Sequence, residues 1–429
     1  MHILFWSVIS AAFIGPGTVT TAASSGAGYG YSLIWALIFS TLACYILQET
    51  STRITVVSGK NLGQAMKSVY GKSVPGKFLI FLSLAAILIG CAAFEAGNIL
   101  GAATGIVLVF PDLPNSSIIA AIGLIAGGLL WKGSIRQIAL VLGVIVAFLG
   151  ICFLITAFMV PFDFQGFLIG ALFPSIPGGS ELLVLGLIGT TVVPYNLFLG
   201  SGMKHSQTTK EMKVSLFIAI GLGGLISIAV LMTGTAIAGT FTFEALAAEL
   251  NRLIGPIGPW LLGLGLFGAG LSSTLTAALA GAITASSILG KSTMEDAWSQ
   301  NGSGFRVVWG GILLTGMIFG LLEVQPVPAI ILAQALNGIF LPLIAIVLFL
   351  LINNTDLVKV DHQNGALYNV LTAVVVYLTF LIGCTNLMRV YTSISGTDTP
   401  GQIWIVVISF ILFLIVCGPV IRKITITRP

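Results

Sequence analysis

Two prolines fall in the middle of long apolar stretches of this sequence, beside residues whose oxygens could bind an ion. The first lies in Gly15-Pro16-Gly17-Thr18 and the second in Val193-Pro194. Because proline lacks an N–H, it cannot bond the carbonyl four residues earlier, which belongs to Ala12 in the first stretch and Thr190 in the second. Free carbonyls at membrane depth are tolerated only around a buried site or a wet cavity. The two breaks therefore predict a site that backbone carbonyls help to form.

Two carboxylates also fall within apolar stretches. Glu49 precedes Arg53 by four residues at the end of its stretch, a spacing that favours a local ion pair on a helix. Glu95 has no basic neighbour and lies mid-stretch, where an ionisable residue indicates a function by default. We therefore expect Glu49 to be structural and Glu95 to serve the site.

The elements that must position these groups are transmembrane helices. Hydrophobic residues make up 57% of the 429 residues and charged residues only 7%, far from a soluble protein. About twelve stretches are long enough to cross a bilayer. All of the 18 Lys and Arg residues except Arg252 and Arg389 fall on one side of such a topology. By the positive-inside rule, both termini are cytoplasmic in a multi-pass protein of the cell (plasma) membrane.

The broken stretches are the first and the sixth. This spacing is expected when two five-helix repeats of inverted topology enclose a site at the bilayer midplane. The prediction is an all-α integral membrane protein of about twelve helices with a LeuT-type core. One transport domain spans residues 1–429, with repeat one at about 1–160, repeat two at about 181–352 and peripheral helices at about 366–421.

Four motifs, in order along about ten of the predicted helices, resemble the Nramp family of metal-ion transporters. Residues 15–62 are similar to its first two helices, including the Gly-Tyr-Ser-Leu-Ile-Trp entry to the second. Residues 193–201 (VPYNLFLGS) are similar to a family pattern that reads Met-Pro-His-Asn-Leu-Tyr-Leu-His-Ser. Residues 271–281 (LSSTLTAALAG) supply the third match, and Gln334 with Leu341-Pro342 supplies the fourth.

The chain departs from the family where the family binds metal. An Asp and an Asn of an Asp-Pro-Gly-Asn break become Gly15 and Thr18, and a Met of the sixth span becomes Val193. Two histidines linked in the family to proton movement become Tyr195 and Gly200. An acid pair of the third span becomes Glu95 and Asn98.

The resemblance, with the two breaks, implies a secondary transporter that works by alternating access. The family implies a divalent metal cation, here of the Mg/Mn type, held by oxygen ligands and water. The predicted metal ligands are Thr18, Thr190, Glu95 and Gln334, and the predicted coupling residues are Glu95 and Asn98. The whole predicted substrate-binding set is Ala12, Gly15, Gly17, Thr18, Thr190, Val193, Tyr195, Asn196, Gln334 and Asn337.

An alternative cargo remains open from the residues themselves. A break without a carboxylate leaves a half-helix N-terminus, with N–H groups from Gly17 to Thr20, facing the cavity, which suits an amino acid or another carboxylate solute. A carbonyl-lined site can also hold Na⁺ or K⁺, so coupling to a monovalent cation is a further expectation. Asn337 would share a helix face with Gln334, and bonding between helices explains it equally well.

Other function classes find no support. Gly-Lys-Ser at residues 71–73 and 290–292 lacks the upstream glycine of a phosphate-binding loop, and no catalytic arrangement is present. The sequence therefore predicts no enzyme and no cofactor. The basic residues mark orientation and predict no binding of nucleic acid. The expected partners are the lipid bilayer and a small ion or solute.

Overall fold

The computed structural model describes residues 14–132, 136–202, 209–290, 295–359 and 363–395, with residues 404, 406–411, 413–415 and 417–418. Within these ranges all regular structure is helical. Ten segments are long and apolar enough to cross a bilayer, and they correspond to the second to eleventh predicted spans. The first and twelfth predicted spans extend into residues outside the described ranges. The all-α membrane class is thereby confirmed.

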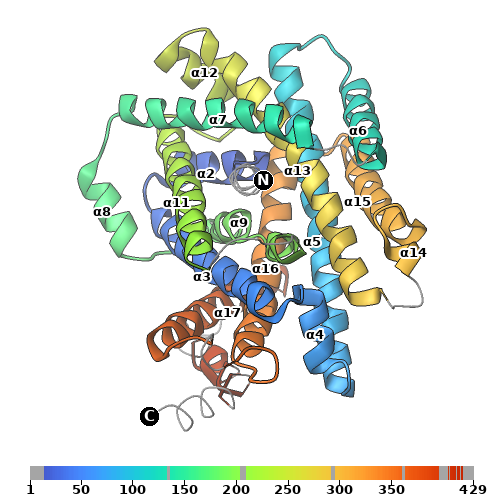
Figure 1. Ribbon diagram of the computed structural model, residues 1–429. Coiled ribbons are helices and arrows are strands. Elements are labelled where there is room, and N and C mark those ends of the chain that lie inside the picture. The colour runs from blue at the N-terminus through green and yellow to red at the C-terminus, as the bar shows by residue number, and fades with distance from the viewer. Residues whose placement is uncertain are drawn as a thin grey trace.

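Figure 1 shows the helices in space. In chain order they are α2 (Pro16–Tyr29), α3 (Ile34–Ser58), α4 (Leu62–Tyr70), α5 (Val74–Val109), α6 (Asn115–Lys132), α7 (Arg136–Met159), α8 (Phe164–Leu172), α9 (Glu181–Thr191), α10 (Pro194–Gly202), α11 (Thr209–Gly234), α12 (Phe243–Ile254), α13 (Ile257–Leu289), α14 (Glu295–Trp298), α15 (Ser303–Leu321), α16 (Pro326–Ile352) and α17 (Ala366–Ser395).

Short polar caps set where several helices begin and end. Asn61 accepts a bond from the Gln64 amide at 2.9 Å, and the Gln64 side chain bonds back, so that α4 starts with a capping box. Ser73 and Thr242 cap α5 and α12 in the same way with one side-chain bond each. Gly59 ends α3 in the left-handed conformation, which glycine adopts without strain. These caps satisfy backbone groups that have no partner within the helices.

The long helices α5 and α13 lie side by side (Figure 1). Glycines make this close approach possible, because a Cβ on Gly270 would lie 2.6 Å from the Asn98 carbonyl oxygen and one on Gly263 would lie 2.7 Å from the Gly105 carbonyl oxygen. Small residues at such contacts are how membrane helices pack without a hydrophobic driving force between them. The α5–α13 pair is thus a rigid support for whatever lies against it.

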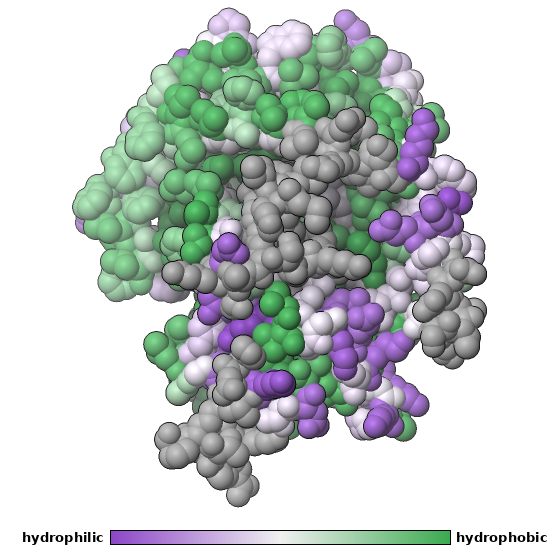
Figure 2. Space-filling view, in the orientation of Figure 1, coloured by the Kyte–Doolittle hydropathy of each residue, from purple (hydrophilic) through white to green (hydrophobic). Residues whose placement is uncertain are grey.

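The outer surface is apolar, as a bilayer requires. Large hydrophobic side chains such as Phe158, Phe217 and Leu124 are 90%, 67% and 75% exposed. Figure 2 shows hydrophobic residues over the upper and left parts of one face, with hydrophilic residues gathered toward the lower part.

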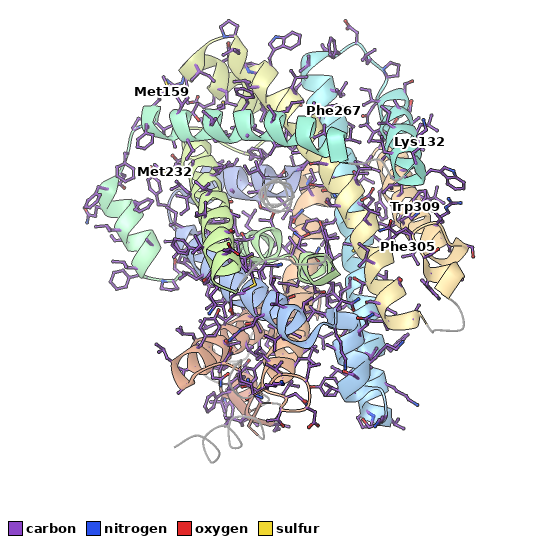
Figure 3. All side chains as sticks on the ribbon, viewed as in Figure 1. Lys132, Met159, Met232, Phe267, Phe305 and Trp309 are labelled. Carbon is purple, nitrogen blue, oxygen red and sulfur yellow. The ribbon has the colours of Figure 1, made fainter. Side chains whose placement is uncertain are left out.

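Basic loops that the charge pattern places on one side of the membrane do meet at one end of the molecule. The Lys67 ammonium donates to the Gly290 carbonyl at 2.9 Å, which joins the second-to-third loop to the eighth-to-ninth loop. The Arg306 guanidinium stacks over the Trp131 ring at 4.0 Å from its centroid. Lys132 and Trp309 mark this contact between α6 and α15 in Figure 3. These contacts agree with the predicted clustering of the loops.

The loops predicted on the other side also meet one another. The Trp35 indole N–H donates to the Ser175 carbonyl at 2.8 Å, and the Tyr29 hydroxyl lies 3.4 Å from the Gly178 carbonyl oxygen. Both bonds join the connection between α2 and α3 to the segment before α9. The entry to the sixth span is therefore held against the exit of the first.

Glu49 forms the predicted ion pair with Arg53, at 3.1 Å, and both side chains are nearly or fully buried. Lys213 of α11 lies 3.5 Å from the other Glu49 oxygen. Arg53 also donates to the Asn364 amide oxygen and stacks over the Tyr368 ring, 5.3 Å from its centroid. The buried carboxylate is therefore compensated twice, and the same cluster ties α3 to α11 and α17.

Loss of the buried Glu49–Arg53 pair and loss of an exposed ion pair are expected to affect stability by different amounts. Replacing Arg53 by Gln leaves the Glu49 carboxylate buried with less compensation, and we expect a loss of about 3 kcal/mol in the free energy of unfolding. The matched control is Arg252→Gln, because Arg252 pairs with Glu249 at 2.5 Å on the exposed side of α12, where ion pairs contribute little. Denaturation of the purified protein in detergent measures both. Equal stability of the two variants would contradict the structural role of the cluster.

Candidate substrate site at the two helix breaks

The predicted break in the sixth span is present, and a helix begins at each of the two prolines; the first half of the first span lies outside the described residues. α9 ends at Thr191, residues Val192 and Val193 are not helical, and α10 begins at Pro194. α2 begins at Pro16, with Gly15 extended at φ −102° and ψ 172° as its N-cap. Proline is favoured at the first helical position because its missing N–H would have no partner there. At these positions proline therefore starts a helix inside the bundle without removing a helical hydrogen bond.

A hydrogen bond joins the two broken spans at this level. The Thr18 hydroxyl of α2 lies 3.0 Å from the Thr190 hydroxyl of α9. Thr18 is 1% exposed and Thr190 is 3% exposed. Pro194 has no N–H for the Thr190 carbonyl. Two hydroxyls and a backbone oxygen therefore lie at one buried point.

Gln334 of α16 completes this cluster. Its side-chain amide lies directly against Gly17, where a Cβ on the glycine would collide with it. Gln334 is 1% exposed, and its Oε1 atom has no hydrogen-bond partner among the described residues. An acceptor buried without a partner is costly. This oxygen is consequently suited to a ligand that enters between α2, α9 and α16.

The start of α2 packs against α5 and lies close to α13. Pro16 packs against Gly101 of α5, which has no room for a Cβ, and a Cβ on Gly15 would lie 3.5 Å from the Ser273 hydroxyl of α13. The sequence analysis placed Ser273 only in the third matching motif and did not select Gly101. The third span contains several glycines, any of which could have met the first helix break. Only the packing shows that Gly101 is the one that contacts Pro16.

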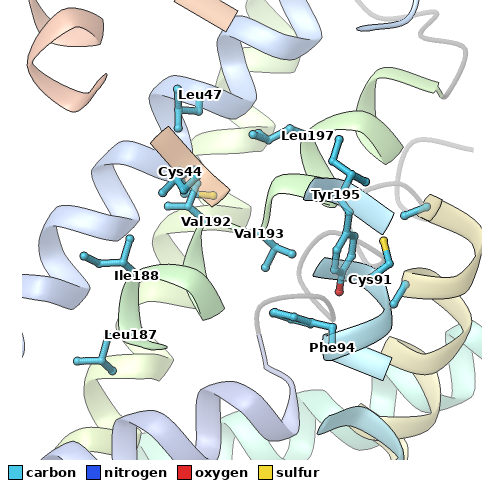
Figure 4. Packing of buried hydrophobic residues seen from close by; sticks show 14 of the residues in the cluster. Cys44, Leu47, Cys91, Phe94, Leu187, Ile188, Val192, Val193, Tyr195 and Leu197 are labelled. Carbon is cyan, nitrogen blue, oxygen red and sulfur yellow. The ribbon is translucent and has the colours of Figure 1, made fainter. Parts of the chain in front are cut away.

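The residues after the second break have different surroundings. Val193 is 3% exposed, lies in the apolar core and accepts a backbone bond from Asn196 at 3.0 Å. In Figure 4 the Tyr195 ring extends from α10 toward Cys91 and Phe94, and it packs edge-on against Phe94 with ring centroids 5.3 Å apart. Asn196 is partly exposed. None of these three contacts the Thr18–Thr190 pair through a hydrogen bond in the described structure.

Asn337 faces the third span. Its amide donates to the Ala333 carbonyl of its own helix at 3.2 Å, and its oxygen lies beside Gly90 of α5. Asn337 therefore contacts α5, while Gln334 one turn earlier contacts α2.

Glu95 and Asn98 lie on a different face of α5 from the residues that meet α16. Gly97 faces Ile330 and Ala333 of α16, at 3.6 and 3.7 Å from an added Cβ. Two residues along a helix correspond to a rotation of roughly 200°, so Glu95 points away from α16. Its side chain packs instead against Gly316 of α15. No contact in the described part of the chain joins Glu95 to the Thr18–Thr190 pair.

Two expectations concern the start of the first span. Ala12 lies outside the described residues. The expected row of free N–H groups from Gly17 to Thr20 is wrong for Val19, whose amide donates to the Gly15 carbonyl at 3.1 Å. Because the helix begins at Pro16, its fourth residue already takes part in helical bonding.

The arrangement offers neutral oxygen atoms. The described residues contain no group of three or more His, Cys, Asp and Glu side chains that could hold a metal. Hydroxyl, amide and carbonyl oxygens are ligands for hard cations such as Mg²⁺ and Mn²⁺, and Mg²⁺ in particular keeps several of its waters. This set of neutral oxygen donors suits weak binding of an ion that keeps part of its hydration shell.

Comparison with known proteins agrees with this geometry. The sequence model of the natural resistance-associated macrophage protein-like (Nramp) family matches residues 7–389. A divalent metal cation transporter of Deinococcus radiodurans is 28% identical over 374 residues, covering 80% of each chain. That of Bacillus subtilis is 29% identical over 292 residues, covering 64% of this chain and 68% of the relative.

Solved structures share the fold. A manganese transporter of Eremococcus coleocola matches with a TM-score of 0.70 and 18% identity, over 98% of this chain and 93% of that one. A nucleobase-cation-symport-1 family transporter matches with a TM-score of 0.58 and 14% identity, over 99% and 93%. The predicted LeuT-type architecture is confirmed.

The contact between α9 and α16 is tight enough to test. A Cβ on Gly189 would collide with the Gln334 backbone carbonyl and lie 2.7 Å from the Gly338 amide nitrogen. Gly189→Ala is expected to lower the free energy of unfolding by about 1–3 kcal/mol, because backbone cannot swing aside. The control is Gly221→Ala in α11, where no atom lies within 4 Å and alanine favours the helix. Thermal unfolding compares them, and a Gly189→Ala protein as stable as the control would contradict this packing.

Proposed function

Because the chain belongs to the Nramp family, whose model spans residues 7–389, we propose that it is a secondary transporter that carries a divalent metal cation of the Mg/Mn type across the membrane by alternating access. The relatives described above are named as divalent metal cation transporters. We propose the same kind of cargo, a divalent metal cation, for this chain, although the ligands of its site differ from the family pattern.

The observation that carries the proposal is the Thr18–Thr190 contact. It brings hydroxyl groups of both broken spans together at 3.0 Å, with the unpartnered Oε1 of Gln334 on the neighbouring helix. An ion that separates the two hydroxyls would gain both as ligands, together with the Gln334 oxygen and the carbonyl that Pro194 leaves free. Gly15, Gly17 and Asn196 line the route to this point.

The absence of a carboxylate and a thioether in this cluster bears on which metal binds. Without a thioether the site lacks a soft ligand, so it does not favour soft metals. Without a carboxylate it cannot neutralise a dehydrated dication, whose desolvation would cost several kcal/mol or more. A cation that keeps much of its hydration shell avoids this cost. Mg²⁺ and Mn²⁺ fit these conditions.

The organic-solute alternative has less support. It relied on free N–H groups along the start of α2, and one of them, on Val19, is already bonded. The family relationship also favours the metal.

We propose that α2, α9 and α10 move as part of one bundle against a scaffold that includes α5 and α13. The Ser51 hydroxyl of α3 donates to the Leu197 carbonyl at 2.7 Å, and the Leu62 amide donates to the Ser201 hydroxyl at 3.1 Å. These bonds attach the second half of the sixth span to α3 and the loop after it. Rocking of such a bundle around a midplane site is how inverted-repeat transporters alternate access.

Coupling in this chain differs from that linked to the family histidines. Tyr195 is buried in the apolar core, and Gly200 lies against the Gln48 side-chain amide. Glu95 and Asn98 are therefore the proposed coupling residues. We further propose the plasma membrane as location, with both termini in the cytoplasm, since the basic loops cluster at one end.

Loss of the hydroxyl ligands tests the cargo site. Thr18→Val and Thr190→Val keep the side-chain shape and remove one oxygen each, so we expect the affinity for Mn²⁺ and Mg²⁺ to fall by about tenfold per substitution, the equivalent of about one good hydrogen bond. Calorimetric titration of the purified protein measures this. Ser25→Ala is the control, because the Ser25 hydroxyl bonds within α2 to the Thr21 carbonyl at 2.7 Å. Unchanged metal affinity in both threonine variants would reject this site.

A disulfide between the first span and the scaffold tests the movement. The Gly15 position lies 3.5 Å from the Ser273 hydroxyl when a Cβ is added, which is within reach of a disulfide. In a background without the five native cysteines, Gly15→Cys with Ser273→Cys should lose metal uptake into proteoliposomes on oxidation and regain it on reduction. The reduced double variant is its own control. Uptake that continued after complete cross-linking would refute the rocking mechanism.

A further inference from the structure

Glu95 differs from the other carboxylate inside the bundle. It is 0% exposed, and neither of its oxygens has a hydrogen-bond partner among the described residues. No ion pair within the described ranges includes it, whereas Glu49 has both Arg53 and Lys213. A buried carboxylate without compensation costs several kcal/mol. The charged form of Glu95 therefore needs a proton or a cation to neutralise it, and the described chain supplies no cation.

The packing of α5 on α13 shows what lies opposite Glu95. A Cβ on Gly270 would touch the Asn98 carbonyl oxygen, and one on Gly281 would lie 3.6 Å from the Cys91 sulfur. The residue numbers run in opposite directions along the two helices, so they are antiparallel. Glu95 lies between Cys91 and Asn98 and about one turn from each, on the face of α5 that meets α13.

Thr274 occupies the matching position on α13. It lies four residues after Gly270 and seven before Gly281, a spacing that keeps it on the face toward α5. Thr274 is 0% exposed, and its hydroxyl is a second buried polar group without a hydrogen-bond partner in the described structure. By register the hydroxyl is at the level of Glu95.

Asn98 contributes the third group, one turn further along α5. It is 2% exposed, and its Nδ2 atom also has no hydrogen-bond partner among the described residues. Gly316 of α15 closes the space from the side, because a Cβ there would lie 2.7 Å from Glu95 Cγ. Three buried polar side chains thus lie at one junction of α5, α13 and α15.

We propose that Glu95 and Thr274, with Asn98 beside them, bind a small monovalent cation, Na⁺, at a site separate from the cargo site. One Na⁺ neutralises one carboxylate, and it takes the carboxylate and hydroxyl oxygens as ligands together. A dication would leave a net positive charge buried with no second carboxylate. A proton on Glu95 would also neutralise the carboxyl, and the protonated group would pair with the Thr274 hydroxyl directly, so binding of Na⁺ itself has to be measured. Among cations, the single charge and the oxygen donors fit Na⁺ best.

The site is placed to influence the break in the sixth span. Phe94 precedes Glu95 and packs edge-on against Tyr195, at 5.3 Å between centroids, and Tyr195 directly follows Pro194. An ion that holds Glu95 in place would also fix the adjoining turn of α5 against this ring. The binding site stands without any statement about the cargo, and only the coupling of Na⁺ to metal movement rests on the proposed function.

Binding of ²²Na⁺ to the purified full-length protein in nanodiscs, with choline as the replacing cation, tests the site. We expect saturable binding that falls by about tenfold or more in Glu95→Gln, and by a smaller factor in Thr274→Val. Both variants keep the side-chain shape, and unfolding curves report whether each is folded. The matched control is Thr284→Val, because Thr284 is equally buried on α13 but its hydroxyl bonds the Ala280 carbonyl at 2.7 Å. Its binding should equal that of the wild type.

Three results would overturn the proposal. They are no saturable ²²Na⁺ binding by the wild type, unchanged binding in a folded Glu95→Gln protein, and a Glu95-dependent proton titration without Na⁺ binding at any pH. A Thr18→Val titration separates this proposal from the proposed function. Loss of Mn²⁺ binding with intact ²²Na⁺ binding supports two distinct sites. A wild type that binds Na⁺ through Glu95 but binds no divalent metal would refute the cargo and leave the Na⁺ site standing.

Discussion

Every backbone polar group inside a bilayer needs a partner within the protein, and the broken helices depend on how this chain meets that requirement. Pro16 and Pro194 each begin a helix at mid-span, so the missing proline N–H falls where a helix has no bond to lose. Near these helix starts the Thr18 and Thr190 hydroxyls bond to each other. The proposed substrate site follows from the same constraint, because the carbonyl that Pro194 leaves without its helical bond is available to an ion.

Proline position alone does not decide whether a span breaks. Pro342 lies inside α16, and the helix continues from Pro326 to Ile352 without interruption. The two breaks differ from it in their local surroundings, because Gly15 takes an extended N-cap conformation and Val192 and Val193 leave the helix before Pro194. The break in the sixth span, the ten membrane helices and the Glu49–Arg53 pair could be predicted from the sequence, because each follows from the position of a proline, from hydropathy or from a four-residue spacing.

Contacts between distant helices were the part that local patterns could not supply. Nothing in the sequence shows that Gln334 meets Gly17 while Asn337, three residues later, meets Gly90. Likewise Glu95 was expected among the cargo ligands, yet its rotation about α5 turns it toward α13 and α15. Hydropathy places a residue at a depth in the membrane, but the side of the helix it occupies depends on which neighbour packs there. Glycines decide this, since they allow helices to approach at some positions only.

The distribution of charge links these features. Glu49 lies near the end of its span and is compensated by two cations, so it holds three helices together without needing an ion. The cluster at the breaks is built from neutral oxygens, which suit the weak and reversible binding of a hydrated cation that the proposed function requires. Of the two buried carboxylates in the described residues, Glu95 is the one without an ion pair. Its neighbour Phe94 packs against Tyr195 next to the second break, which gives a physical route from the charge balance at Glu95 to the helix proposed to move. In the proposed mechanism a neutral cargo site selects the ion and a separate charged site couples, two tasks that a single acidic site would combine.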